Sequence, residues 1–174
     1  WATFESIGPE LALVGHWNPD FDCKASVSIA RYLLERMGKK VHLFVSGAKN
    51  GAAPEVVSGL DDQLDFRPIG ELPRGLPFIL IDAPDSEMPH VNAPAGCKPS
   101  LVIDTHGGKT NGTLTCVSDR HAAVSSIMLS LLFDTVSPDD IRFRSPELTK
   151  LATLAFLGIM TDTASLRRAT QYDI

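Results

Sequence analysis

One short stretch of the sequence gathers three side chains that can bind a cation. His16, Asp20 and Asp22 lie within residues 16–22, whose sequence is His-Trp-Asn-Pro-Asp-Phe-Asp. Two like charges held close together at a buried turn are costly unless something positive lies between them. A divalent cation meets that need. A ligand set of carboxylates with a minority of imidazole suits Mn²⁺ or Mg²⁺ better than a thiol-seeking metal.

A solvated turn is the alternative interpretation of the same stretch. In that case Asn18 and Pro19 make the bend, and Asp22 caps the helix that follows. The stretch alone does not decide between a metal site and a turn, so the rest of the chain has to be considered.

Further acidic residues follow two apolar runs later in the chain. Residues 78–82 and 101–104 are continuous apolar segments that end in Asp82 and Asp104, and His106 comes two residues after the second aspartate. Continuous apolar runs of this length are typical of parallel strands that are buried on both faces. The sequence thus predicts metal-capable groups at the ends of separate strands.

The elements that position these groups alternate along the chain. Apolar spacings predict helices over 27–37 and 124–132 and a last helix from Ser145 and Pro146 to Asp162, with a loop and short helix at 47–62. The predicted strands cover residues 11–16, 41–45, 64–69, 78–82 and 101–104. This alternation predicts an α/β fold with an open, mostly parallel sheet flanked by helices. Ligands of such sheets bind beyond the carboxyl ends of the strands, so the acidic residues should share one edge.

Composition excludes several classes of protein. The net charge of −5 argues against a nonspecific nucleic-acid binder, and 44% hydrophobic residues suffice for a packed core. Cys23, Cys97 and Cys116 show no CxxC spacing, which argues against a disulfide framework or a zinc ribbon and favours a reducing, cytoplasmic compartment. There is no signal peptide and no apolar run long enough to span a bilayer.

The two ends of the chain suggest a domain taken from a longer protein. The sequence starts at Trp1 without a methionine and stops at residues 171–174 without a closing element. We therefore expect residues 1–174 to form a single domain of a longer protein.

Four motifs, in their order and spacing, resemble those of the DHH superfamily of phosphoesterases. They are residues 16–22, the strand-ending Asp82, the triplet at 104–106 and residues 158–163, with the sequence Gly-Ile-Met-Thr-Asp-Thr. That superfamily includes RecJ-type exonucleases, oligoribonucleases that also act on 3′-phosphoadenosine 5′-phosphate, cyclic dinucleotide phosphodiesterases and family II inorganic pyrophosphatases. The resemblance covers nearly the whole chain. It implies that residues 1–174 are a single Rossmann-like catalytic domain, followed in the longer chain by a C-terminal substrate-binding domain.

The resemblance also implies a centre with two metal ions. His16 and Asp20 would bind one Mn²⁺ (or Mg²⁺), Asp22 and Asp162 would bind the other, and Asp82 would bridge both. Two ions about 3.5–4 Å apart can hold a hydroxide as nucleophile and neutralise the charge that develops on a phosphoryl group.

Catalytic and phosphate-binding roles are implied for residues around the two ions. His106 would face the substrate phosphate, and Asp104 would orient neighbouring groups. Basic residues that could contact the phosphate are Lys24, Lys109, Arg167 and Arg168, each of which could equally be a solvated surface charge.

The chain departs from the superfamily pattern at two places. Thr105 stands where the Asp-His-His triplet has its first histidine, which normally binds the second metal, and a threonine hydroxyl is a poor replacement. The second site should therefore be weakened. Residues 23–26, Cys-Lys-Ala-Ser, replace the usual Ala, apolar, Gly, Ser run. Residues 107–111 are either a small phosphate cradle of backbone N–H groups or a plain turn.

Two functions follow from these matches and departures. The first is a metal-dependent phosphoesterase that hydrolyses phosphodiester or phosphomonoester bonds of nucleotides or short oligonucleotides. The second is a catalytically impaired, DHH-like nucleotide-binding or regulatory module of a larger protein. The expected partners are the nucleotide substrate and the C-terminal domain of the same chain; a homodimer is left open, and no membrane partner is expected.

Overall fold

A parallel sheet of six strands forms the centre of the computed structural model, which describes residues 2–16, 19–45, 64–83, 94, 96–106, 114–118, 120–136 and 145–173. The strand order is β3-β2-β1-β4-β5-β6, and every neighbouring pair is parallel. The strands are β1 (Glu10–Gly15), β2 (Lys40–Val45), β3 (Arg67–Pro68), β4 (Phe78–Ile81), β5 (Leu101–Asp104) and β6 (Leu114–Val117). This arrangement confirms the predicted α/β class with an open parallel sheet.

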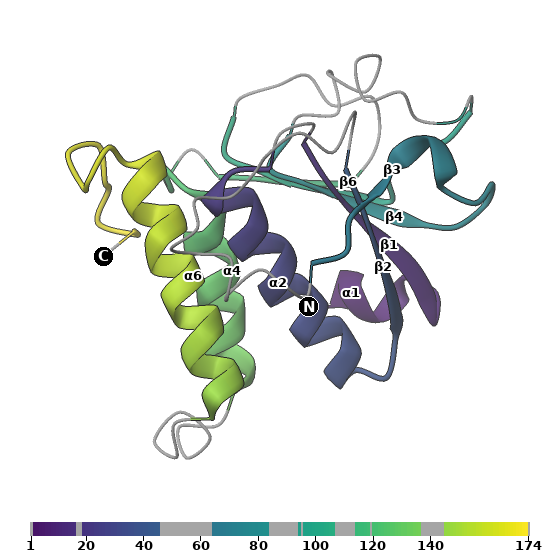
Figure 1. Cartoon of the computed structure of the whole chain (residues 1–174), viewed down its shortest axis with the longest axis horizontal. Coiled ribbons are helices and arrows are strands. Elements are labelled where there is room, and N and C mark those ends of the chain that lie inside the picture. The colour runs from purple at the N-terminus through teal and green to yellow at the C-terminus, as the bar shows by residue number, and fades with distance from the viewer. Residues whose placement is uncertain are drawn as a thin grey trace.

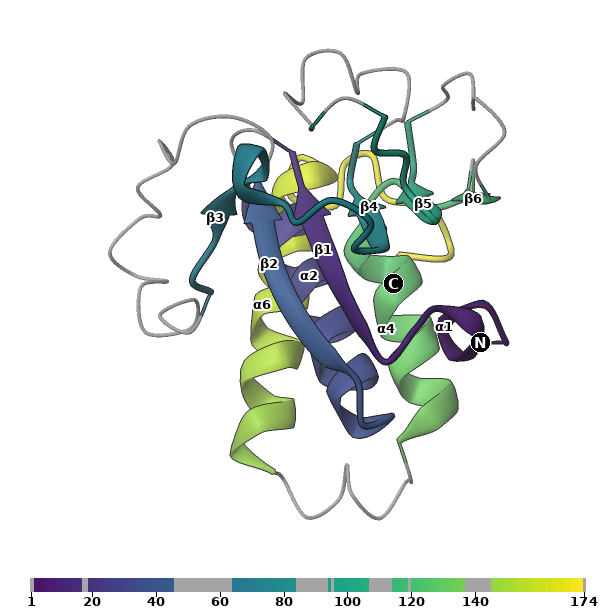
Figure 2. The ribbon, with the colours of Figure 1, turned by 90° about the vertical axis from the view of Figure 1, so that its right-hand side faces the viewer.

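Three long helices cover one face of this sheet. They are α2 (Phe21–Arg36), α4 (Val124–Thr135) and α6 (Pro146–Asp162), which pack side by side behind the strands (Figures 1 and 2). Two shorter elements complete the described structure, the N-terminal helix α1 (Ala2–Ser6) and the 3₁₀ turn η1 (Ile69–Glu71). None of the helices in the described part of the chain is both long and apolar enough to cross a membrane.

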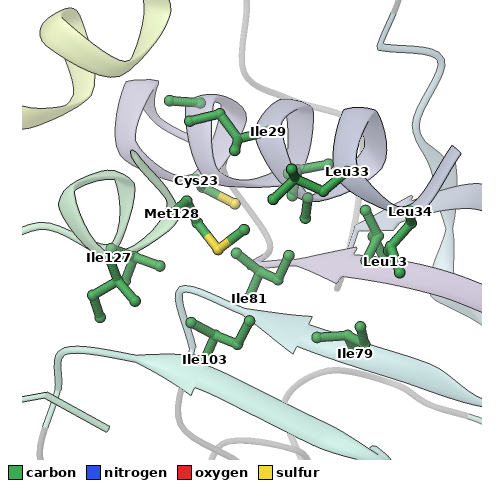
Figure 3. Packing of buried hydrophobic residues seen from close by; sticks show 14 of the residues in the cluster. Leu13, Cys23, Ile29, Leu33, Leu34, Ile79, Ile81, Ile103, Ile127 and Met128 are labelled. Carbon is green, nitrogen blue, oxygen red and sulfur yellow. The ribbon is translucent and has the colours of Figure 1, made fainter. Parts of the chain in front are cut away.

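Alternation along the central strand β1 explains how both faces of the sheet are buried. Leu11 and Leu13 belong to the cluster beneath the three helices, whereas Ala12 and Val14 belong to a second cluster on the other face. Figure 3 shows Cys23 of α2 in the first cluster, among side chains of the neighbouring strands and of α4. The continuous apolar runs in the sequence therefore mark strands that are buried on both faces, as predicted.

Several element boundaries differ from the sequence-based prediction. Helix α2 begins at Phe21, six residues before the expected start, and ends as expected before Gly38, whose φ of 76° is a left-handed conformation that suits glycine. The strand expected over 64–69 is reduced to β3, because η1 begins directly after Pro68. Strand β6 was not predicted. The expected loop at 47–62 lies outside the described residues.

Helix α6 begins where the sequence predicted. Pro146 occupies the first turn and Ser145 the N-cap position, although the Ser145 side chain forms no capping hydrogen bond. The helix runs to Asp162, so it delivers that carboxylate to the end of the helix layer nearest the carboxyl ends of the strands (Figure 1).

Candidate metal centre at the carboxyl edge of the sheet

Three adjacent strands deliver metal-capable side chains to one edge of the sheet. His16 directly follows β1, Asp82 directly follows β4, and Asp104 is the last residue of β5. The strand order places β1, β4 and β5 next to one another. The order of the strands reverses between β1 and β4, and in open α/β sheets this reversal is where ligands bind.

The first group of metal-capable atoms lies between the ends of β1 and β4. His16 Nε2 is 3.7 Å from Asp20 Oδ1 and 3.5 Å from Asp82 Oδ2. Ligand atoms of His16, Cys23 and Asp82 all lie within 4.8 Å of one another. This group therefore contains a buried thiol in addition to the imidazole and carboxylate that the sequence indicated.

Cys23 is the member of this group that the sequence analysis did not identify as a candidate. Its side chain is buried, and a Cβ atom on Gly15 would lie 2.6 Å from its sulfur. The missing side chain of Gly15 thus leaves the space that the thiol occupies. Position 23 could have been found from the helix start, because Asp20 Oδ1 accepts a hydrogen bond of 3.0 Å from the Cys23 backbone N–H.

The second group lies between the ends of β4 and β5 and shares Asp82 with the first. Ligand atoms of Asp82, Asp104 and His106 lie within 4.8 Å of one another. His106 Nδ1 is 2.8 Å from Asp104 Oδ1, and this hydrogen bond raises the pKa of His106. The His106 side chain is 63% exposed, while Asp104 is fully buried. The buried carboxylate thus holds an imidazole that is accessible to solvent.

The carboxyl group of Asp82 lies in surroundings that strongly oppose its ionisation. Burial raises its pKa to about 10, and the charges of Asp22, Asp20, Asp162 and Asp104 act in the same direction. Its backbone is held at a φ of 59°, an unusual conformation for a residue other than glycine. A carboxylate kept in such surroundings needs a nearby cation to be ionised at neutral pH.

Two further carboxylates respond in opposite ways to the same surroundings. Burial raises the pKa of Asp162 to about 6, with contributions from the charges of Asp22 and Asp20. Burial also opposes ionisation of Asp20, but the nearby His16 imidazole, at 3.7 Å, and the hydrogen bond from the Cys23 N–H outweigh it, so the pKa of Asp20 is lowered. The difference follows from the number of hydrogen-bond donors that each carboxylate meets.

Asp22 is buried, and its hydrogen-bond partners are residues about a hundred positions later in the sequence. Its Oδ2 accepts a hydrogen bond of 2.7 Å from the Val124 N–H, and its Oδ1 accepts one of 2.8 Å from the Ser125 N–H. Burial raises the pKa of Asp22. Asp22 thus ties the first turn of α2 to the first turn of α4. The alternative in which Asp22 caps the helix after the turn is wrong, because Asp20 is the N-cap of α2.

Helix α6 approaches the same turn unusually closely. A Cβ atom on Gly158 would lie 2.9 Å from Asp22 Cα, 2.9 Å from Ser125 Oγ and 3.1 Å from the Phe21 carbonyl oxygen. Only a glycine fits there without displacing backbone, since contacts under 3.0 Å are essentially never observed. Gly158 thereby allows α6 to carry Asp162 into the range of the other acids.

The basic residues that were predicted to contact phosphate are less clearly part of this centre. Lys24 is buried on α2, whereas Arg167 and Arg168 are exposed in the turn after α6. Within the described part of the chain, neither arginine side chain forms an ion pair with the acidic residues. Lys109 and the glycine-rich stretch at 107–111 lie outside the described residues. The structure therefore gathers the predicted acids and histidines but not the predicted arginines.

Fold and site together define an α/β protein with an acidic, metal-capable centre at the switch point of a parallel sheet. No protein-family model matches the sequence, and no curated protein matches it. An exopolyphosphatase-related protein from Bacteroides fragilis is similar in structure, with a TM-score of 0.61 and 22% identity over 95% of this chain and 49% of the other. A candidate family II inorganic pyrophosphatase from Methanococcus jannaschii has a TM-score of 0.62 and 19% identity over 94% of this chain and 52% of the other. The shared feature is the fold, and the chain spans about half the length of both proteins.

Proposed function

We propose that this chain is the catalytic domain of a DHH-type, metal-dependent phosphoesterase that acts on nucleotides or short oligonucleotides. The observation that carries the proposal is that two groups of potential metal ligands share one buried carboxylate, Asp82. A shared carboxylate is the arrangement expected where two cations are held close together. The fold is also that of proteins whose names describe hydrolysis of phosphate linkages.

The donor set fits a pair of hard divalent cations. In the proposed centre His16 and Asp20 hold one cation, Asp22 and Asp162 hold the other, and Asp82 contacts both. Burial, together with the excess of carboxylate over nearby positive charge, raises the pKa of Asp82 to about 10, and this supports the assignment. When bound, Mn²⁺ or Mg²⁺ would activate water and neutralise charge on a phosphoryl oxygen.

His106 supplies the contact to the substrate phosphate in this proposal. Its hydrogen bond to Asp104 raises its pKa, so the ring carries a proton over a wider pH range than a free histidine. A protonated, largely exposed imidazole can donate a charge-assisted hydrogen bond to a phosphate oxygen. Asp104 fixes the ring orientation through Nδ1. Lys24, Lys109, Arg167 and Arg168 remain candidates for further contacts to phosphate.

The second candidate function is a nucleotide-binding or regulatory module with impaired catalysis. It is favoured by Thr105, which provides a neutral hydroxyl in place of an imidazole, and by Asp22, whose two oxygens already accept hydrogen bonds from α4. Both features leave fewer donors for the second cation, which should therefore bind less tightly than the first.

Metal binding and hydrolysis together test the proposal. Titration calorimetry of residues 1–174 with Mn²⁺ should detect one tight and one weaker site, and Asp134→Asn, at an exposed position on α4, should leave both unchanged. Hydrolysis of a chromogenic phosphodiester or a dinucleotide should be slow, because the chain spans about half the length of its structural neighbours and a second domain would position the substrate.

Three results would separate the candidates. Binding of no Mn²⁺ would contradict both the enzyme and the assigned ligands. Metal and nucleotide binding without turnover in the longer chain would favour the regulatory module. Rapid turnover by residues 1–174 alone would show that no second domain is needed.

A further inference from the structure

One carboxylate oxygen of the centre has no hydrogen-bond partner within the described part of the chain, although the residue that carries it is fully buried. Asp104 is 0% exposed, and its Oδ2 forms no hydrogen bond with the described residues, while its Oδ1 is 2.8 Å from His106 Nδ1. Buried carboxylate oxygens are normally hydrogen-bonded, and each exception requires a physical reason. The two oxygens of Asp104 therefore have different surroundings, and only one is accounted for by the orientation of His106.

The place of Asp104 in the centre suggests what the second oxygen is for. A ligand atom of Asp104 lies within 4.8 Å of those of Asp82 and His106, and the charge of Asp104 contributes to the raised pKa of Asp82. Asp104 ends β5 and is therefore fixed by the sheet rather than by a loop. It is a rigid, buried anion beside the carboxylate that both groups share.

The second cation also lacks the ligands that the superfamily pattern would supply. Thr105 provides only a hydroxyl, and both Asp22 oxygens accept backbone hydrogen bonds from α4. His106 has its Nδ1 engaged by Asp104, and most of its ring is exposed. Among these residues, Asp104 Oδ2 is the buried anionic donor that is not already used.

We propose that Asp104 binds the second cation directly through Oδ2 and so replaces the ligand that is lost at Thr105. This inference rests on the proposed function, since it assumes that two cations bind at the shared Asp82. It goes beyond the orienting role assigned to Asp104 from the superfamily resemblance: one oxygen holds His106, and the other binds the metal. A carboxylate oxygen is a harder ligand than an imidazole nitrogen. The second site should therefore prefer Mn²⁺ or Mg²⁺ to Zn²⁺.

Four proteins test this assignment by calorimetry and by electron paramagnetic resonance of bound Mn²⁺. They are residues 1–174 with the native sequence and the variants Asp104→Asn, Thr105→Val and His106→Ala. Asp104→Asn should weaken the second site on the order of 100-fold and remove the spin coupling between the two ions. Thr105→Val has nearly the same shape without the hydroxyl and should leave both affinities unchanged.

His106→Ala separates a ligand from a residue that only positions the histidine. If Asp104 acts solely by orienting His106, removing the ring should weaken the second site as much as Asp104→Asn does. Direct binding by Asp104 predicts instead that His106→Ala keeps the second site while it weakens binding of inorganic phosphate. Unfolding midpoints in EDTA establish whether each variant is folded, and Asp104→Glu, which moves the carboxylate by one methylene, replaces Asp104→Asn if that variant is unfolded.

The outcomes distinguish this inference from the proposed function. Two Mn²⁺ sites that survive Asp104→Asn, or a second site lost in Thr105→Val or His106→Ala, would overturn the role of Asp104 and leave the two-metal proposal standing. A native protein that binds no Mn²⁺ would overturn the proposed function itself.

Discussion

Two buried aspartates, one directly after β4 and one near the end of the sequence, meet very different surroundings. Asp82 and Asp173 are each 7% exposed. Asp173 accepts hydrogen bonds from the Ala122 and Thr170 N–H groups and from the Ser126 and Thr170 hydroxyls. Burial opposes its ionisation, but these donors outweigh it and the pKa of Asp173 is lowered. Burial and neighbouring carboxylates instead raise the pKa of Asp82 to about 10.

The ionised carboxylate of Asp173 therefore stabilises the fold, whereas the ionised carboxylate of Asp82 would destabilise it. Asp173 joins the C-terminal segment to the start of α4 through donors that satisfy its charge. Asp82 faces other acids in a strained backbone conformation, and the His16 imidazole, 3.5 Å from Asp82 Oδ2, does not offset burial and those charges. Unfavourable local electrostatics of this kind cluster at functional sites, because binding of a ligand relieves them.

The largest effect is expected at the shared carboxylate. Asp82→Asn should weaken Mn²⁺ binding at both sites on the order of 1,000-fold, about 4 kcal/mol, because one residue serves both ions. Without metal the variant should be at least as stable as the native protein, since it removes a carboxylate that other acids surround. Calorimetric titration and chemical unfolding in EDTA measure the two quantities. Normal metal stoichiometry in this variant would remove Asp82 from the bridging role.

Asp173→Ala should have the opposite pattern. It leaves the Ala122 and Thr170 N–H groups and the Ser126 hydroxyl without their acceptor, so the free energy of unfolding should fall by about 3 kcal/mol. Mn²⁺ affinity should change little. Asp134→Ala, at an exposed position on α4, the helix whose start Asp173 contacts, is the matched control and should change stability by less than about 0.5 kcal/mol. An equally mild effect at Asp173 would mean that water replaces the lost acceptor.

What the sequence could predict is limited by how far apart the interacting residues are. The strand-ending positions of Asp82 and Asp104 follow from continuous apolar runs, and a parallel sheet then brings them to one edge. The hydrogen bonds that the Val124 and Ser125 N–H groups donate to Asp22 join residues about a hundred positions apart and leave no local signal. The start of α2 at Phe21 has a local signal instead: Asp20 is its N-cap, whereas the sequence-based interpretation assigned the capping role to Asp22.

Close packing at Gly158 gives the next effect in size. Gly158→Ala places a methyl group 2.9 Å from Asp22 Cα and 2.9 Å from Ser125 Oγ, so α6 must shift away from the start of α2. The expected loss of stability is about 2 kcal/mol. Because α6 also carries Asp162, this change should weaken Mn²⁺ binding as well, which Asp173→Ala should not do. Gly70→Ala, where nothing lies within 4 Å of the added atom, is the control. Unchanged unfolding and metal titration curves would show that α6 adjusts without cost.

The smallest effect concerns Asp162 and the pH dependence of stability in EDTA. Its pKa is raised from 3.8 to about 6, so the folded state binds this proton more tightly than the unfolded chain does. The resulting stability is fully present below pH 3.8 and is lost as the pH rises through about 6. Since Asp162 is only half-buried, solvent screening should limit the loss to about 1 kcal/mol.

Chemical unfolding at intervals between pH 4 and pH 7 should therefore show a shallower decline in stability for Asp162→Asn than for the native protein. Asp82, with its pKa of about 10, keeps destabilising both proteins towards alkaline pH, so the difference in slope isolates Asp162. Identical slopes would mean that Asp162 is solvated and that the electrostatic stress is confined to Asp82 and its nearest neighbours.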